Sequence, residues 1–137
     1  MIAMDFDITR KKINIFKIGK LYCFKYYFND REIFEGLSKY YNEKNYRFEC
    51  NTVGERNKII KYLWKMGFDA DLVENPSEYM VKIDRNKRYA PFLKYSLEQA
   101  EVGNNKIFLM KDMVSVELAI EHGAERFTDN IESLFEK

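Results

Sequence analysis

The chain has 137 residues, of which 46% are hydrophobic and 33% charged, so it is long and apolar enough for a globular domain rather than a disordered segment. Its formal net charge of +1 conceals an asymmetry, because residues 1–68 carry 14 lysines and arginines against 8 aspartates and glutamates, whereas residues 69–137 carry 9 against 14. The sequence shows no run of the ~20 apolar residues that a membrane-spanning helix needs and no signal-peptide pattern at its start, so we expect a cytoplasmic protein without a membrane partner.

The spacing of apolar residues predicts the elements of the first half of the chain. Residues 2–9 alternate strictly between apolar and other residues, as in a half-buried strand. The strand predicted at 21–28 is apolar on both faces, which indicates a central position in a sheet. Asp30 and Thr52 are predicted N-caps of helices, and Gly67 is the predicted end of the second helix. The predicted strands are 2–9, 13–18, 21–28 and 46–50, and the predicted helices are 30–42 and 53–66.

In the second half, two predicted strands are joined by the turn-forming segment 74–77 and are expected to form a hairpin. Pro91 suits the first turn of a helix, and Asp112 and Gly123 suit the two ends of another. The predicted strands are 69–73, 78–84 and 107–110, and the predicted helices are 91–102, 114–122 and a short one from 128. Together these elements predict one α+β domain over residues 1–137, in which a mixed, mostly antiparallel sheet is flanked by about four helices. A ferredoxin-like arrangement of part of the chain is the alternative.

The residues that usually carry catalysis are scarce. Cys23 and Cys50 are far apart in strand-like runs, so buried free thiols are expected, with a disulfide as the alternative. His122 is predicted in the last turn of a helix, where it interacts favourably with the negative end of the helix dipole. No triad, zinc ligand set or glycine-rich phosphate loop is recognisable. We therefore expect no cofactor and favour a non-catalytic role over an enzyme.

The remaining enzyme hypothesis depends on carboxylates. Asp69, Asp71 and Glu74 form the closest acidic cluster and could hold Mg²⁺. Asp69 and Asp71 share one face of a predicted strand, and an edge strand with a charged face resists aggregation. We favour the edge strand, so no metal site is predicted.

Basic and aromatic residues suggest a polyanionic partner, DNA or RNA. Two cationic runs lie at strand ends and could contact phosphates, and they would form one patch if the fold brought them together. Tyrosines in the basic half could stack on bases, although packing in the core is the alternative. The predicted nucleic-acid-binding residues are Arg10, Lys11, Lys12, Arg85, Lys87, Arg88, Tyr22, Tyr26 and Tyr46.

Two further interpretations follow from composition. The opposite charges of the two halves would equally suit a protein-interaction or self-assembly module, in which the basic half meets the acidic half of a copy or an acidic protein. Aromatic residues make up 16% of the chain, which is typical of AT-rich genomes, and the abundant lysine and glutamate would suit a thermophile.

One stretch of the chain resembles a known family. Residues 33–37 (IFEGL) are similar to a motif helix, and the strand at 46–50, the helix at 53–66 and the strands at 69–73 and 78–84 follow in the same order. Residues 33–84 thus resemble a degenerate half of the LAGLIDADG homing endonucleases, or of their non-cutting relatives among WhiA-type regulators. Residues 38–42 (SKYYN) lack the metal-binding acid of that family, so the resemblance implies DNA binding without cleavage.

Overall fold

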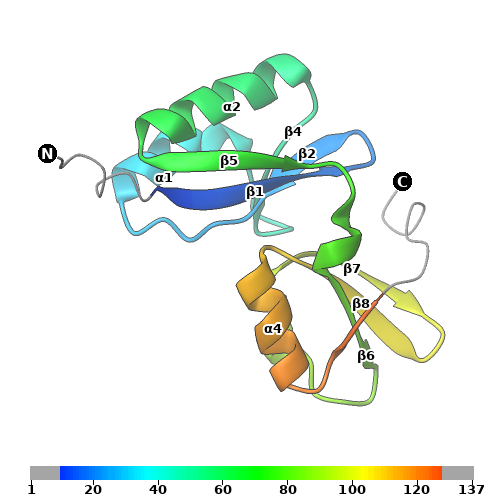
Figure 1. Cartoon of the computed structure of the whole chain (residues 1–137). Coiled ribbons are helices and arrows are strands. Elements are labelled where there is room, and N and C mark those ends of the chain that lie inside the picture. Colours follow the sequence, from blue (N-terminus) through cyan, green and yellow to red (C-terminus); the bar gives the residue numbers. More distant parts are fainter. Residues whose placement is uncertain (1–9, 128–137) are drawn as a thin grey trace, which may run out of the picture.

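The computed structural model describes residues 10–127, which form two β-sheets with helices packed on one face of each (Figure 1). The expected α+β class is confirmed, with mostly antiparallel strands and four α-helices in the described part of the chain. The strands divide between two sheets, where one sheet was expected. The strand predicted at 2–9 and the helix predicted from Thr128 lie outside the described residues.

The first sheet, sheet A, has the strand order β3-β4-β2-β1-β5. All neighbours are antiparallel except β1 and β5, which are parallel. Helix α2 connects β4 to β5 and returns the chain so that β5 runs parallel to β1. As the sequence predicts, β2 is central, since it lies between β4 and β1. The elements are β1 (Lys11–Ile18), β2 (Leu21–Phe24), α1 (Arg31–Leu37), the 3₁₀ helix η2 (Ser38–Tyr40), β3 (Tyr41–Asn42), β4 (Arg47–Cys50), α2 (Val53–Lys65) and β5 (Phe68–Val73).

The second sheet, sheet B, is wholly antiparallel and has the order β7-β8-β6-β9. Its chain order is strand, helix, strand, strand, helix, strand, which is the ferredoxin-like sequence of elements. The ferredoxin-like alternative therefore describes the second half of the chain. The elements are η3 (Pro76–Tyr79), β6 (Met80–Asp84), α3 (Ala90–Leu93), β7 (Ser96–Val102), β8 (Asn105–Met110), α4 (Met113–Glu121) and β9 (Glu125–Arg126).

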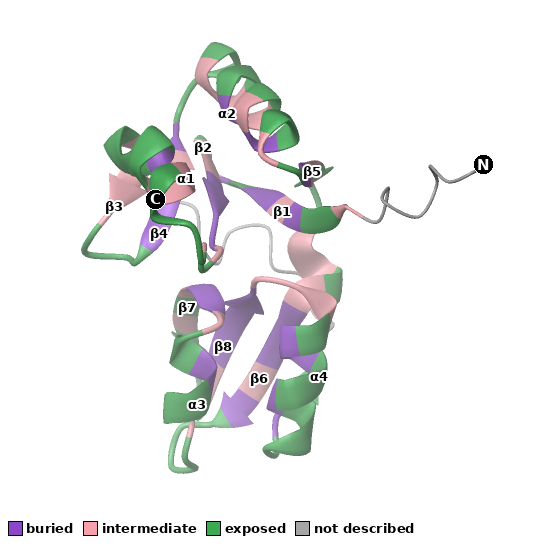
Figure 2. Cartoon of the chain, turned by 90° about the vertical axis from the view of Figure 1, so that its left-hand side faces the viewer, coloured by how far each residue is buried: buried purple, intermediate pink, exposed green. Residues whose placement is uncertain are grey.

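Three apolar clusters hold these layers together. One lies between sheet A and its helices and includes Phe48 and Leu63, and another lies between sheet B and its helices and includes Phe108. The third joins the two sheets, since Phe16 of β1 and Leu109 of β8 both belong to it. Figure 2 shows the buried positions along β1, β6 and β8. The alternation of faces along each strand sends successive side chains into different clusters.

The best-marked element of the sequence is confirmed almost residue for residue. Helix α2 begins after Thr52, whose hydroxyl oxygen accepts a hydrogen bond from the Glu55 amide at 3.1 Å. The same hydroxyl donates to the Glu55 carboxylate at 3.2 Å. Gly67 follows the helix with a φ of 96°, a left-handed conformation that glycine adopts without strain. The caps predicted at Asp30 and Asp112 are confirmed too.

Four sequence-based predictions are corrected. Residues 69–73 and 78–84 do not form a hairpin, because β5 pairs with β1 in sheet A while β6 lies in sheet B. In the connection between them, the Asn75 side chain accepts a hydrogen bond from the Ser77 amide and begins η3, so the chain does not reverse there. The helix predicted over 30–42 ends at Leu37, and β2 ends at Phe24 rather than at residue 28.

The fourth correction concerns the helix predicted over 91–102. Helix α3 ends at Leu93, and Ser96–Val102 form strand β7, which pairs with the buried strand β8. Gly103 has a φ of 61° in the two-residue turn that joins them. The glutamate, glutamine and alanine of β7 favour a helix in isolation, but pairing with a buried neighbour outweighs that preference.

Both cysteines are free, as expected, and buried. They lie on adjacent strands but face different layers, since Cys23 belongs to the cluster between the sheets and Cys50 to the cluster under the helices. Burial, ahead of the charges nearby, raises the pKa of Cys23 to about 12, so its thiol stays protonated and unreactive. No helix among the described residues is long and apolar enough to cross a membrane.

Candidate nucleic-acid interface

The outer face of α2 carries a row of cations. Lys58, Lys61 and Lys65 are exposed and follow one another at spacings of three and four residues, so they lie on one side of the helix. Ile59 and Leu63, on the opposite side, are buried against sheet A. None of the ion pairs among residues 10–127 involves these lysines. We call Lys58, Lys61, Lys65 and Trp64 the α2 lysine face.

Trp64 is the single tryptophan of the chain, and its side chain is 61% exposed. The Arg10 guanidinium lies 4.6 Å from the centre of the indole ring, a cation–π contact. Arg10 also donates from Nε to Asp69 Oδ1 at 2.9 Å and from Nη2 to the Trp64 carbonyl oxygen. Arg10, predicted to contact phosphate, is thus engaged within the protein, where it holds Trp64 in place.

Lys11 and Lys12 remain available at the same end of sheet A. Lys11 pairs with Phe68, three residues after the end of α2. The Lys12 ammonium is 3.9 Å from the Asp71 carboxylate, and the two side chains are 72% and 53% exposed. An ion pair so open to solvent adds little stability, so it leaves Lys12 free to exchange partners.

The second cationic run lies elsewhere. Arg85, Lys87 and Arg88 are exposed in the turn between β6 and α3, where the Arg85 amide donates to the Asn104 carbonyl oxygen at 2.8 Å. Figures 1 and 2 both place this turn at the end of sheet B farthest from α2. The structure does not bring the two runs together, because β6 runs away from sheet A in the second sheet.

The three predicted tyrosines differ in their surroundings. Tyr22 is partly buried, and the Arg56 guanidinium of α2 lies 5.1 Å from its ring. Tyr26 is partly buried too, and its ring meets that of Phe68 edge to face at 5.1 Å. Tyr46 is 65% exposed. Of the three, Tyr46 has a ring open to a partner.

Tyr26 and Tyr46 nevertheless line one common pocket of about 140 Å³. Seven of its eight lining residues are aromatic, and they come from the segment after β2, from α1 and from β3, β4 and the turn between them. We call it the aromatic pocket. It is lined by Lys25, Tyr26, Tyr27, Phe28, Phe34, Tyr41, Tyr46 and Phe48.

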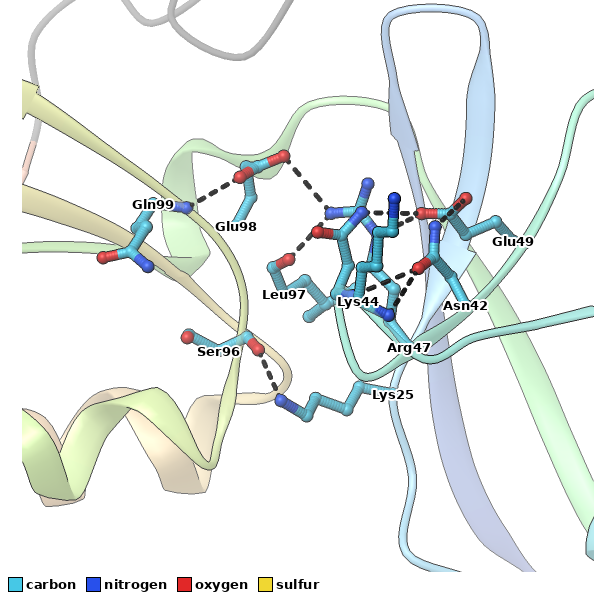
Figure 3. A network of polar contacts seen from close by, with 10 residues as sticks. Lys25, Asn42, Lys44, Arg47, Glu49, Ser96, Leu97, Glu98 and Gln99 are labelled. Atoms are coloured by element: carbon cyan, nitrogen blue, oxygen red, sulfur yellow. Dashed lines mark hydrogen bonds and ion pairs between the residues drawn. The ribbon is translucent and has the colours of Figure 1, made fainter.

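Lys25 is buried at the junction of the two sheets. Its ammonium donates to the carbonyl oxygen of Ser96 at 2.9 Å (Figure 3) and to that of Leu93 at 3.4 Å. None of the ion pairs within the described residues includes it. Burial, followed by the charges of Lys111 and Arg47, lowers the pKa of Lys25 to about 8. At neutral pH this ammonium therefore keeps a positive charge beside the aromatic pocket.

A second polar group also joins the sheets. Arg47 is 4% exposed and donates to Glu49 Oε2 at 2.6 Å, to the Leu97 carbonyl oxygen at 2.7 Å and to Glu98 Oε2 at 3.3 Å (Figure 3). Burial alone would raise the pKa of Glu49, but hydrogen bonds from Arg47 and Asn42 outweigh it and hold that pKa below its usual value. This network links β4 to β7, and we assign it a structural role.

The acidic cluster has structural partners. Strand β5 is an edge strand of sheet A, as the sequence predicts. Asp69 accepts the hydrogen bond from Arg10, and Asp71 faces Lys12. Within residues 10–127 no three histidine, cysteine, aspartate or glutamate side chains converge as a metal site would require.

His122 is the C-cap residue of α4, close to its predicted position, and lines a separate cavity of about 340 Å³ between α3 and α4.

The α2 lysine face was not predicted from the sequence, although the signal was present. Lys58, Lys61 and Lys65 are spaced as neighbours on one helix face, opposite the apolar residues that were used to predict the helix. The aromatic pocket has no such signal, because its residues come from separate segments.

Comparisons of the chain with protein-family models, with curated proteins and with solved structures give no match.

Proposed function

We propose that this protein is a non-catalytic nucleic-acid-binding module that contacts phosphates through the α2 lysine face. The observation that carries the proposal is the row of Lys58, Lys61 and Lys65 beside an exposed tryptophan, with no carboxylate partner among the described residues. Lysines arranged along one helix can follow a phosphate backbone, and neutralising each phosphate releases counterions. Trp64 adds an apolar ring that can pack on sugar or base.

The distribution of charge supports the same surface. Residues 10–73, which form sheet A and its helices, contain 14 lysines and arginines against 8 aspartates and glutamates. Residues 74–127, which form sheet B and its helices, contain 8 against 9. The positive field is therefore concentrated in one layer, where it would attract a polyanion.

The ferredoxin-like half is a poorer candidate. Modules that bind RNA on a four-stranded sheet stack bases on exposed aromatic residues. The corresponding face of sheet B carries Met80, Ile107 and Leu109, which are buried in the cluster shared with sheet A. Bases cannot stack on that face, so the α2 lysine face is the favoured binding surface.

The test measures binding of a labelled 12-nucleotide duplex, and of one of its strands, across a range of salt concentrations. Replacing Lys58, Lys61 and Lys65 by alanine should weaken binding and reduce the slope of log K against log salt by about two to three. Replacing Arg85, Lys87 and Arg88 by alanine removes the same charge from the far end of sheet B and is the matched control. Equal losses in the two triple variants would refute the assigned surface. Binding by the wild-type protein no tighter than by an acidic control protein would refute the function.

A second candidate function has its own observation. Helix α4 exposes Val114 at 67%, Leu118 at 39% and Ile120 at 38%, beside the exposed Glu117 and Glu121. This apolar and acidic face complements the α2 lysine face, so a second copy or an acidic protein could dock there. Light scattering at low and high salt tests it: a dimer that dissociates as salt rises supports self-association, and a monomer at every salt concentration refutes it.

A further inference from the structure

The aromatic pocket has a rigid base. Phe48 is 1% exposed, and its ring stacks on Phe24 at 4.8 Å with an interplanar angle of 11°. Edge-to-face contacts join Phe48 to Tyr41 at 5.0 Å and to Phe34 at 5.6 Å. Interlocking rings of this kind are poorly able to collapse, so the space above them persists.

The rim of the pocket holds exposed rings in defined positions. Tyr27 is 52% exposed, and its hydroxyl donates to the Lys94 carbonyl oxygen at 2.6 Å. Tyr46 is 65% exposed and has a φ of 54°, the one positive φ among the described residues other than glycine. A tyrosine in this conformation is strained, and such strain concentrates at ligand sites. The turn that holds Tyr46 is fixed by the Asn42 side chain, which accepts from the Lys44 amide at 2.9 Å.

Size and charge indicate what the pocket can hold. Its volume of about 140 Å³ is close to that of the apolar cavity of ~150 Å³ that takes up benzene, so one aromatic ring fits. Lys25 lines the pocket, and the Lys111 ammonium lies 5.9 Å from the ring of Tyr26. Aromatic cages for ammonium ligands depend on an attractive field for cations, which the Lys25 charge opposes. The charge of Lys111 is balanced by the Asp112 carboxylate, which lies 2.7 Å from its ammonium. The pocket therefore suits a flat ring that is attached to negative charge.

The pocket also lies close to the α2 lysine face. Tyr26 contacts Phe68, whose carbonyl oxygen lies 3.5 Å from a guanidinium nitrogen of Arg10, and Arg10 stacks on Trp64. Both surfaces thus meet at the end of sheet A where β1 and β5 begin and β2 ends. A single strand that follows the α2 lysine face can reach the aromatic pocket without leaving the surface of sheet A and its helices.

We propose that the aromatic pocket receives one unpaired base of a single-stranded nucleic acid, with Tyr46 stacking on it at the rim. This inference rests on the proposed function and narrows its partner from nucleic acid in general to single strands. A base in a duplex is paired and stacked, so it can enter a pocket of this depth only by leaving the helix.

The experiment compares three probes: a 12-nucleotide single strand, the same strand with abasic sites throughout, which has the same charge, and the 12-base-pair duplex at matched phosphate concentration. Tyr46→Asn removes the ring and keeps a residue that tolerates positive φ. Tyr46→Phe keeps the ring. Val102→Ala, at an exposed side chain (41%) on β7, is the control. Melting curves establish that each variant is folded.

The wild-type protein should prefer the single strand over the abasic strand. Tyr46→Asn should weaken single-strand binding by about fivefold or more, the loss expected for one stacking contact. It should leave duplex and abasic binding unchanged, and Tyr46→Phe and Val102→Ala should bind like wild type. If Tyr46→Asn weakens no probe while the α2 triple variant weakens all of them, the pocket is refuted and the proposed function stands. If the wild-type protein binds none of the probes, the proposed function is refuted as well. Binding of a free mononucleotide as tight as that of the strand would overturn the inference, because it would make the pocket a small-ligand site.

Discussion

The strongest prediction for stability concerns Arg47, which joins the two sheets. Arg47→Met keeps a long apolar stem but removes the charge and every hydrogen bond of the guanidinium. Glu49 and Glu98, whose side chains are 16% and 18% exposed, lose their cation, and the Leu97 carbonyl oxygen loses its donor. Removing one partner of a buried ion pair costs about 3–5 kcal/mol. We expect the free energy of unfolding to fall by an amount in this range.

The pH dependence of the free energy of unfolding should also differ between the wild type and Arg47→Met. Because the pKa of Glu49 is lower in the folded protein than its ordinary value of 4.5, its interactions stabilise the fold above that value and are lost as the pH falls through the lowered pKa. The wild-type protein should therefore lose more stability than Arg47→Met between about pH 5 and pH 3. Urea titrations at several pH values measure both effects. A loss below about 1 kcal/mol at neutral pH, within the range of exposed ion pairs, would refute the reasoning.

The same urea titrations test whether the stability lost in Arg47→Met returns when its two carboxylate partners are replaced as well. Replacing Arg47, Glu49 and Glu98 together by methionine or leucine should restore much of the stability that Arg47→Met loses, because no buried charge is left without a partner. A triple variant less stable than Arg47→Met would show that the network contributes more than its desolvation costs.

Three further predictions follow from single positions. The pKa of Lys25 is lowered from 10.5 to about 8, so between these pH values the unfolded chain binds a proton that the folded protein does not. In urea titrations, the stability of the wild type relative to Lys25→Met should therefore rise with pH between about 8 and 10.5. A methyl group at Gly36 would collide with the Tyr62 ring of α2, so Gly36→Ala should destabilise the protein by about 1–2 kcal/mol despite its better helix propensity, and a raised melting temperature would contradict the contact. Thr52→Ala removes the N-cap of α2 and should cost about 1 kcal/mol in the same denaturation assay, whereas Thr52→Ser should cost a few tenths.

Local signals were sufficient where an element is specified by its own residues. Helix α2 could be predicted to within a residue because Thr52 satisfies a free amide at its start and Gly67 supplies the left-handed residue at its end. The central position of β2 could be predicted because its side chains are apolar on both faces. The basic character of the first half was also evident, since charge is a property of composition.

The division of the strands into two sheets was decided by tertiary structure. An alternating strand can pair with any edge that buries its apolar face. Nothing within 69–73 therefore specifies β1, which is distant in the sequence, as a parallel neighbour rather than an adjacent hairpin partner. The same choice made Ser96–Val102 a strand, because pairing with β8 contributes more than helix propensity does. It also separated the two cationic runs by placing β6 in sheet B.

The aromatic pocket depends on that choice as well. Its rings come from α1 and from segments on both sides of it, and they meet only because β4 pairs antiparallel with β2 and brings Phe48 opposite Phe24. Sequence determines which side chains are available and which short stretches fold locally, since caps, turns and periodicity act over a few residues. Which of those side chains face one another follows from long-range strand pairing, whose free energy is shared by the whole core.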